Sequence, residues 1–173
     1  MRHFLFNIVQ SEASSIKVNY PIILNFVRPL ELEETSAICR LMKARFLECC
    51  NIGFVFGIVH PFMVLGYPGR IDEILKNFSD ADFKEVFEYA AKKDKSVELN
   101  ICMLYQETEK NASGFPEEYS RMYSIARECG CKFHLGSDAH APDRATAERF
   151  ELAQKFAAAC GLVFPEDPIS LRS

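Results

Sequence analysis

Residues 79–102, SDADFKEVFEYAAKKDKSVELNIC, contain the change of pattern that decides the fold. Their first part predicts a helix over Asp80–Lys93, and Ser79 is its expected N-cap. The acidic residues of the first turn suit the positive end of the helix dipole. Their second part predicts a strand over Val97–Cys102. A helix that runs directly into a strand is typical of an α/β domain.

The same alternation continues along all 173 residues, without an internal repeat or a linker-like run. The other predicted elements are strands over Phe4–Val9, Ile22–Val27, Phe54–Val59 and Phe133–Leu135, and helices over Glu31–Cys49, Arg70–Asn77, Pro116 to about Gly130, and Pro142 to about Cys160. Strands separated by helices pair in parallel. We therefore expect one domain over residues 1–173, with functional groups at the C-terminal ends of the strands.

Composition and charge exclude several classes of protein. Hydrophobic residues are 49% and charged residues 25% of the chain, as in ordinary globular domains, which disfavours intrinsic disorder. Twenty basic and 24 acidic side chains give a net charge of −4, which disfavours binding to nucleic acids through a basic surface. The longest apolar stretch, Gly53–Gly66, contains His60 and Pro61 and is too short to span a bilayer.

The cysteines and the N-terminal residues favour a cytoplasmic protein. The seven cysteines are odd in number and show no CxxC pair or zinc-type spacing, which suits free thiols in a reducing compartment. The first residues contain too few apolar side chains for the core of a signal peptide. We therefore expect a cytoplasmic location and no membrane partner.

Polar residues stand at the ends of three predicted strands. Asp138 and His140 follow the strand over Phe133–Leu135, and side chains two apart in an extended segment point the same way. A carboxylate and an imidazole that face one point are donors that a divalent metal such as zinc accepts. The alternative is a turn in which Asp138 caps the helix that begins near Pro142.

The other two strand ends carry Glu98 with Asn100, and His60. Glu98 and Asn100 share one face of their strand, opposite apolar Val97 and Leu99. A half-buried Glu98 needs a cation, which is either a metal ion or a Lys or Arg side chain. His60 follows an apolar strand, where a single histidine is more often structural than a ligand.

The remaining histidines and other chemistries have less support. His3 lies near the chain start, where fraying is common, and His134 lies inside a strand without an evident partner, which favours a structural role. Ser137, Asp138 and His140 do not form a hydrolase triad, because consecutive strand side chains diverge and no Gly-x-Ser-x-Gly elbow is present. The sequence also has no Walker loop and no dinucleotide fingerprint.

Read in chain order, His60–Pro61, Glu98–Asn100 and Ser137–His140 resemble motifs of the polymerase and histidinol phosphatase (PHP) family of metal-dependent phosphoesterases. The last stretch carries the resemblance furthest, since Ser-Asp-Ala-His or a near variant is the family's fourth motif. The His-Pro pair is similar to the third motif, and Glu-Leu-Asn is similar to a Glu-Ile-Asn that often lies between them. His3 looks like the family histidine that opens an earlier strand.

The resemblance implies a distorted (β/α)7 barrel, similar to a TIM barrel, with two or three Zn, Mn, Fe or Mg ions at the strand C-termini. It also implies hydrolysis of phosphate esters by a metal-activated water, with a small phosphomonoester such as histidinol phosphate as substrate. The candidate metal ligands that it implies are His3, His60, Asp138 and His140, of which the last three are also the candidate catalytic residues. The candidates for the substrate pocket, or for support of the ligands, are Glu98, Asn100 and Ser137.

The chain departs from the family pattern in its first part. The family's first His-x-His motif, its second-motif histidine and its bridging glutamate have no counterpart, because the only histidines are His3, His60, His134 and His140. We therefore expect the C-terminal portion of the fold, an incomplete barrel without its first strands. Both a chain that has lost these strands and a piece of a longer protein fit this pattern.

An incomplete ligand set and an open barrel have two consequences. The remaining ligands complete at most one metal site, so we expect partial occupancy. Open strand edges expose apolar surface, so we expect a homo-oligomer or a complementing chain that covers the edge. The first hypothesis is a phosphomonoester phosphatase. The alternative is a catalytically reduced remnant or subunit that binds one metal ion or none and acts through association.

Overall fold

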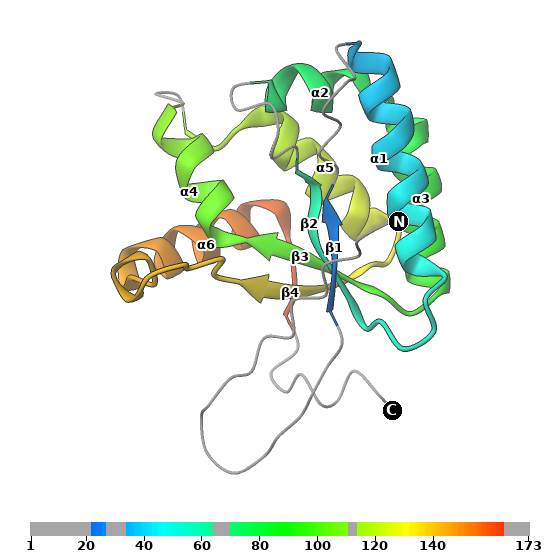
Figure 1. The fold of residues 1–173 in the computed structure, drawn as a ribbon. Coiled ribbons are helices and arrows are strands. Elements are labelled where there is room, and N and C mark those ends of the chain that lie inside the picture. Colours follow the sequence, from blue (N-terminus) through cyan, green and yellow to red (C-terminus); the bar gives the residue numbers. More distant parts are fainter. Residues whose placement is uncertain (1–21, 27–33, 64–69, 111–113, 165–173) are drawn as a thin grey trace.

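The computed structural model describes residues 22–26, 34–63, 70–110 and 114–164 and shows an α/β fold built on one parallel sheet (Figure 1). The strands are β1 (Ile22–Phe26), β2 (Gly57–Met63), β3 (Ser96–Asn100) and β4 (Lys132–Gly136). The helices are α1 (Thr35–Cys50), α2 (Ile71–Asn77), α3 (Asp80–Lys92), α4 (Ile101–Lys110), α5 (Glu117–Glu128) and α6 (Ala147–Cys160), with a 3₁₀ turn, η1, over Pro142–Arg144. The predicted α/β class is confirmed. No helix of the described residues combines the length and the apolar character needed to cross a membrane.

The strands lie in chain order, β1-β2-β3-β4, and each neighbouring pair is parallel. Every connection therefore adds its strand to the same edge of the sheet. Successive right-handed crossovers in one direction place their helices on one face. Within the described residues the sheet is open, with β1 and β4 at its two ends, and it does not close into a barrel there. The strand predicted over Phe4–Val9 lies outside the described residues.

One face of the sheet buries the hydrophobic core. Val97 and Leu99 of β3 lie on this face together with Ile58 of β2 and Phe133 of β4, the register neighbours of Val97, and they form one cluster with apolar side chains of the helices. Helix α3 packs against both α1 and α5 beside this sheet (Figure 1). The centre of the cluster is an aromatic group that consists of Phe46, Phe62, Phe78, Phe83 and Phe87.

Local sequence signals set the ends of α3 and α5. The Ser79 hydroxyl accepts the Asp82 N–H and the Asp82 carboxylate accepts the Ser79 N–H, so the predicted N-cap is confirmed as part of a capping box. Gly130 follows α5 with a φ of 80°, which confirms the predicted stop. Pro116 occupies the N-cap of α5 rather than its first helical position.

The strand predicted to continue to Cys102 ends earlier, at Asn100. The Asn100 Oδ1 accepts the Met103 N–H at 2.9 Å and so starts α4 directly after the strand. An asparagine in this position satisfies one of the unpaired donors of a helix N-terminus. Helix α4 was absent from the sequence prediction because this short polar residue reads equally well as the outer face of a strand.

Three other boundaries differ from the prediction. Phe54 lies in a turn and is 62% exposed, so β2 begins at Gly57. Pro142 opens only the 3₁₀ turn η1, and α6 begins after its N-cap Thr146. Helix α1 begins at Thr35, because Glu34, which was predicted to be helical, is its extended N-cap residue; residues 31–33 lie outside the described part of the chain.

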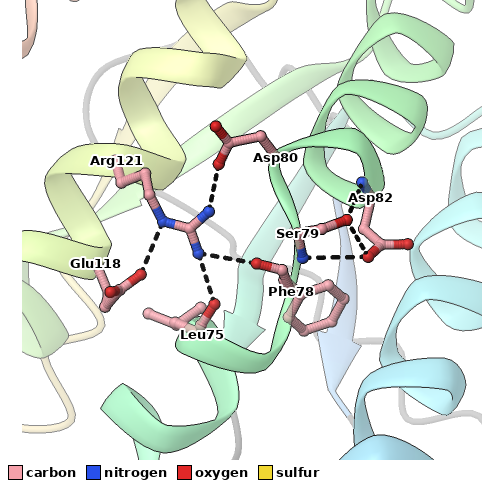
Figure 2. Close-up of polar contacts among 7 residues, drawn as sticks. All are labelled: Leu75, Phe78, Ser79, Asp80, Asp82, Glu118 and Arg121. Atoms are coloured by element: carbon pink, nitrogen blue, oxygen red, sulfur yellow. Dashed lines mark hydrogen bonds and ion pairs between the residues drawn. The ribbon is translucent and has the colours of Figure 1, made fainter.

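Arg121 of α5 binds the turn between α2 and α3 through hydrogen bonds and an ion pair (Figure 2). Its Nη2 donates to the carbonyl oxygens of Leu75 and Phe78 at 2.8 and 3.0 Å. Its Nη1 pairs with Asp80 at 2.6 Å, and its Nε pairs with Glu118 at 2.8 Å. One planar guanidinium therefore joins the end of α2, the start of α3 and the body of α5.

We expect Arg121→Lys to destabilise the fold, because one ammonium group cannot replace a planar fork of donors that reaches four partners. Unpairing partly buried carbonyl oxygens predicts a loss of about 1–3 kcal/mol in the free energy of unfolding, measured by urea unfolding. Arg45→Lys is the matched control, because the Arg45 guanidinium pairs with Glu48 at 2.6 Å along the surface of α1. Equal losses in the two variants would contradict this role of Arg121.

Candidate functional site

The C-terminal ends of β2, β3 and β4 bring three separate stretches of sequence to one edge of the sheet. His60 lies on β2, Glu98 lies near the end of β3, and Asp138 lies two residues after β4. Parallel strands present their C-terminal ends on the same side of the sheet. Side chains that are far apart in the chain can therefore meet here.

His60 and His140 both contact the carboxylate of Asp138. The His60 Nε2 lies 3.5 Å from Asp138 Oδ1, and the His140 Nε2 lies 3.3 Å from the same oxygen. The side chains of His60 and Asp138 are 12% and 18% exposed, whereas that of His140 is 79% exposed. The arrangement is a largely buried His–Asp pair that a second histidine reaches from the solvent side.

The electrostatics of the pair favour its charged form. Burial raises the pKa of Asp138, but the hydrogen bond with His60 and the positive charges of His60 and His140 outweigh burial and lower this pKa below its ordinary value. Burial lowers the pKa of His60, but the bond to Asp138 and the charges of Glu98 and Asp138 outweigh it and raise this pKa. Each shift favours the ionised form of the group itself, because its partner carries the opposite charge.

Glu98 is the second carboxylate of this edge. Glu98 is 4% exposed. Its Oε2 accepts the backbone N–H of His60 at 2.7 Å and an Nδ2–H of Asn100 at 3.3 Å. Burial raises the pKa of Glu98 by more than these hydrogen bonds and the charge of His60 lower it. In the described part of the chain no Lys or Arg forms an ion pair with Glu98.

The backbone is strained at two of the three strand ends. His60, Phe62 and Asp138 have φ values of 52°, 57° and 48°, in the left-handed region that residues with side chains rarely adopt. The register between β1 and β2 is also interrupted here, between Leu24 and Phe26 of β1. Such strain costs about 1–3 kcal/mol per residue and collects at functional sites. The His60–Asp138 pair is therefore the strongest candidate site in the described residues.

Asp138 and His140 meet for a different reason from the one that the sequence suggests. The prediction assumed an extended segment, but the φ of Asp138 is 48°. The contact at 3.3 Å follows instead from a left-handed turn directly after β4. The alternative role of Asp138 as a cap of the last helix is wrong, because Thr146 caps α6 and the Asp138 carboxylate faces the two histidines.

Of the other predicted site residues, Asn100 also contacts Asp138, through a side-chain hydrogen bond that helps to lower the pKa of this carboxylate. Its Oδ1 caps α4 and its Nδ2 donates to Glu98. The Ser137 Oγ accepts the Ala139 N–H at 3.4 Å within the loop after β4. His3 lies outside the described residues, so it is not placed relative to the site.

Two glycines make room for polar side chains on the face of the sheet opposite the hydrophobic core. A Cβ on Gly57 would lie 2.7 Å from Cε1 of His134, and a Cβ on Gly136 would lie 1.8 Å from Oε1 of Glu98. The His134 Nδ1 lies 2.8 Å from Ser96 Oγ, and its buried Nε2 has no partner among the described residues. Sequence reasoning missed these pairs, because they depend on the register between strands that are not adjacent in sequence.

The cluster of His60, Asp138 and His140 matches a metal site only in part. Ligand atoms about 2.0–2.1 Å from a tetrahedral zinc ion are about 3.3 Å apart. The two Nε2–Oδ1 distances, 3.5 and 3.3 Å, are close to this value, and the donors are of suitable type. However, no group of three His, Cys, Asp or Glu side chains in the described ranges is arranged to hold an ion. These residues supply pairs of ligands rather than a complete site.

Four of the cysteines are too deeply buried to act as nucleophiles in place of a metal. All seven are free thiols. Burial raises the pKa of Cys50 and of Cys131 to about 12, and that of Cys39 and of Cys49 to about 11. These four thiols are therefore protonated and unreactive at neutral pH.

The chain matches no protein-family model, no curated protein and no solved structure. A function for this edge of the sheet must therefore follow from its own residues and contacts.

We expect His134 to make the stability of the fold depend on pH. Burial lowers the pKa of His134 to about 4, whereas an exposed histidine titrates near 6.5, so the unfolded chain binds more protons between these values. The free energy of unfolding therefore falls as the pH drops from about 6.5 to about 4, by up to about 3 kcal/mol. Urea unfolding above pH 7 and near pH 5 measures this loss.

His134→Asn should lose less stability than the wild type over the same pH interval, because asparagine does not titrate. Both side chains are neutral above pH 7, so the difference between the two proteins there measures the effect of packing and of the contact with Ser96, without a change of charge. Equal losses on acidification in the two proteins would contradict the assignment to His134.

Proposed function

We propose that this chain is a PHP-like phosphoesterase that hydrolyses a small phosphomonoester with the help of divalent metal ions. The observation that carries the proposal is the contact of His60 and His140 with one oxygen of Asp138. These residues belong to two of the three stretches on which the family resemblance rests. The third stretch supplies Glu98, whose carboxylate accepts the backbone N–H of His60.

The order of the strands supports an incomplete barrel of the PHP type. Parallel strands in chain order, with the core on one face, are typical of a segment of a (β/α) barrel, whereas doubly wound sheets reverse their strand order. The opposite face of a barrel sheet points inward. Here that face carries Ser96, Glu98 and Asn100, which are polar and at most 4% exposed.

His60, Asp138 and His140 would hold the metal ion, together with His3, which lies outside the described residues. A bound Zn, Mn, Fe or Mg ion would supply a water of lowered pKa and a positive charge that faces the phosphate. Because the described residues provide pairs of ligands, we expect partial occupancy.

The chain itself prepares the site through charge and accessibility. The ionised Asp138 attracts cations, and its oxygen Oδ1 is shared by two imidazoles. His60 is mostly buried and so keeps one orientation, whereas His140 is 79% exposed and so can meet a ligand that arrives from solvent. The site thus combines a buried histidine of fixed orientation with a solvent-accessible one. This arrangement suits a small anionic substrate that binds together with a cation.

A second candidate function is association with another chain. Leu135 of β4 is 40% exposed, and β4 lies at one end of the sheet formed by the described strands. An open sheet end with exposed apolar side chains is a place where another strand or chain can pair. In that case the chain is a catalytically reduced subunit, and a second copy or a complementing chain covers β4.

Metal analysis beside a phosphatase assay tests the first candidate. We expect the wild-type chain supplied with Zn or Mn to retain metal and to hydrolyse p-nitrophenyl phosphate. Asp138→Ala and His140→Ala should each weaken metal binding by at least about tenfold and abolish turnover, because each removes a ligand. Asp143→Ala, at an exposed carboxylate of η1, is the matched control and should change neither property.

Unchanged metal content in both ligand variants would contradict the assignment of Asp138 and His140. Less than one metal per chain without turnover, and elution as a species larger than the 19.7 kDa monomer, would favour association instead.

A further inference from the structure

Glu98 contacts all three strands that form the candidate site. From β3, its Oε2 accepts the His60 N–H of β2 at 2.7 Å. Its Oε1 lies over Gly136 of β4, where an added Cβ would be only 1.8 Å away. Asn100 donates to the same Oε2 at 3.3 Å and helps to keep the carboxylate in this direction. One buried side chain therefore connects the middle of β3 with the middle of β2 and the last residue of β4.

The hydrogen bond from the His60 N–H to Glu98 lies beyond the last described register pair of β2 and β3. The described register between β2 and β3 ends at Ile58 and Val97, although β2 continues to Met63. Beyond that point the backbone turns left-handed at His60, whose φ is 52°. A left-handed residue in a strand is less stable than an extended one unless its surroundings support it. The carboxylate of Glu98 provides such support directly at the strained residue.

The space for this carboxylate comes from Gly136. A Cβ at this position would meet not only Oε1 of Glu98 but also its Cδ at 2.7 Å and its Cγ at 3.1 Å. Any other residue would therefore displace the whole end of the Glu98 side chain. Since Oε2 belongs to the same rigid carboxylate, the displacement would also break the bond to the His60 N–H.

We propose that Glu98 is a positioning residue that holds the left-handed backbone of His60 and so directs the His60 imidazole toward Asp138. We further infer that Gly136 is required because it leaves room for the Glu98 carboxylate. The inference rests on the proposed function only where it treats His60 as a functional residue. Burying a carboxylate costs free energy that an apolar side chain would not cost, which argues against a role in packing alone.

The test is a double-mutant cycle at Glu98 and Gly136. The variants are Glu98→Ala, Glu98→Gln, Gly136→Ala and the double variant E98A/G136A. Gly53→Ala is the matched control, because a Cβ on Gly53 meets nothing within 4 Å. NMR of the ¹⁵N-labelled full chain reports the His60 amide through its proton chemical shift and its hydrogen-exchange rate. Amides of the β3–β4 ladder serve as the internal reference.

In the wild type we expect a downfield, slowly exchanging His60 amide, as a short bond to a carboxylate predicts. Glu98→Ala and Gly136→Ala should both shift this amide upfield and speed its exchange by about tenfold or more, because one removes the acceptor and the other displaces it. Glu98→Gln should stay near the wild type, because the amide oxygen still accepts. Gly136→Ala should add little in the Glu98→Ala background, since the two substitutions act on one contact.

If Glu98 only stabilises the fold, Glu98→Ala should speed hydrogen exchange of the β3–β4 ladder amides as much as that of the His60 amide. Glu98→Gln would then not keep the chemical shift and exchange rate of the His60 amide near their wild-type values. That result would overturn the proposal, as would a His60 amide that is unchanged in Glu98→Ala. An effect of Gly136→Ala that persists in full in the double variant would also overturn it. If Gly136→Ala alone does not fold but the double variant does, the result supports a collision between the added Cβ and Glu98. If neither variant folds, the result contradicts this collision.

Zinc binding to the same variants separates this proposal from the proposed function. Weaker binding in Glu98→Ala and Gly136→Ala, with unchanged binding in Glu98→Gln and Gly53→Ala, would support positioning of a ligand. A wild-type chain that binds no zinc would contradict the proposed function, and the NMR result would then decide on Glu98 by itself.

Discussion

Burying a carboxylate costs free energy unless hydrogen bonds compensate, and Glu98 of β3 is buried against His60 of β2 and Gly136 of β4. The strands meet this requirement with their backbones. β2 turns an N–H toward the carboxylate at His60, and β4 has no side chain at Gly136. The left-handed backbone of His60, the glycine in β4 and the early end of the β2–β3 register therefore all lie next to one buried side chain.

Packing of Phe62 in the hydrophobic core explains how the left-handed backbone of β2 is tolerated. Phe62 also has a left-handed backbone, yet its ring is 1% exposed and lies 5.1 Å from the ring of Phe46 and 5.0 Å from that of Phe78. Burial of one such ring contributes about 1.5–3 kcal/mol, which is comparable with the cost of about 1–3 kcal/mol for a strained residue. The aromatic core thus offsets strain that β2 carries at the candidate site. Arg121 stabilises the helix turn that covers this core.

The candidate site has properties that fold stability alone does not require. It combines a mostly buried ion pair, a second carboxylate without a basic side-chain partner in the described residues, and an exposed imidazole that reaches the same oxygen. Groups of this kind are costly in a core and useful at a site where a cation and an anionic substrate meet. This balance is the physical basis for preferring a metal-assisted hydrolase over a purely structural role.

The sequence by itself determined the α/β class, the capping of α3 by Ser79 and the placement of Glu98 and Asn100 on one face of a strand. Each of these depends on the local backbone period or on a cap, which neighbours in the chain control. The tertiary structure alone decided that Gly136 makes room for Glu98, that Ser96 meets His134, and that a left-handed turn brings Asp138 to His140.

These features were not readable from the sequence for a physical reason. The register between β3 and β4 sets which side chains face one another, and packing of the helices between the strands sets that register. The left-handed backbone of Asp138 is likewise uncommon for a residue with a side chain, and the local sequence does not require it. Local sequence patterns indicate which backbone conformation a segment prefers. The candidate site lies where tertiary contacts impose a different conformation.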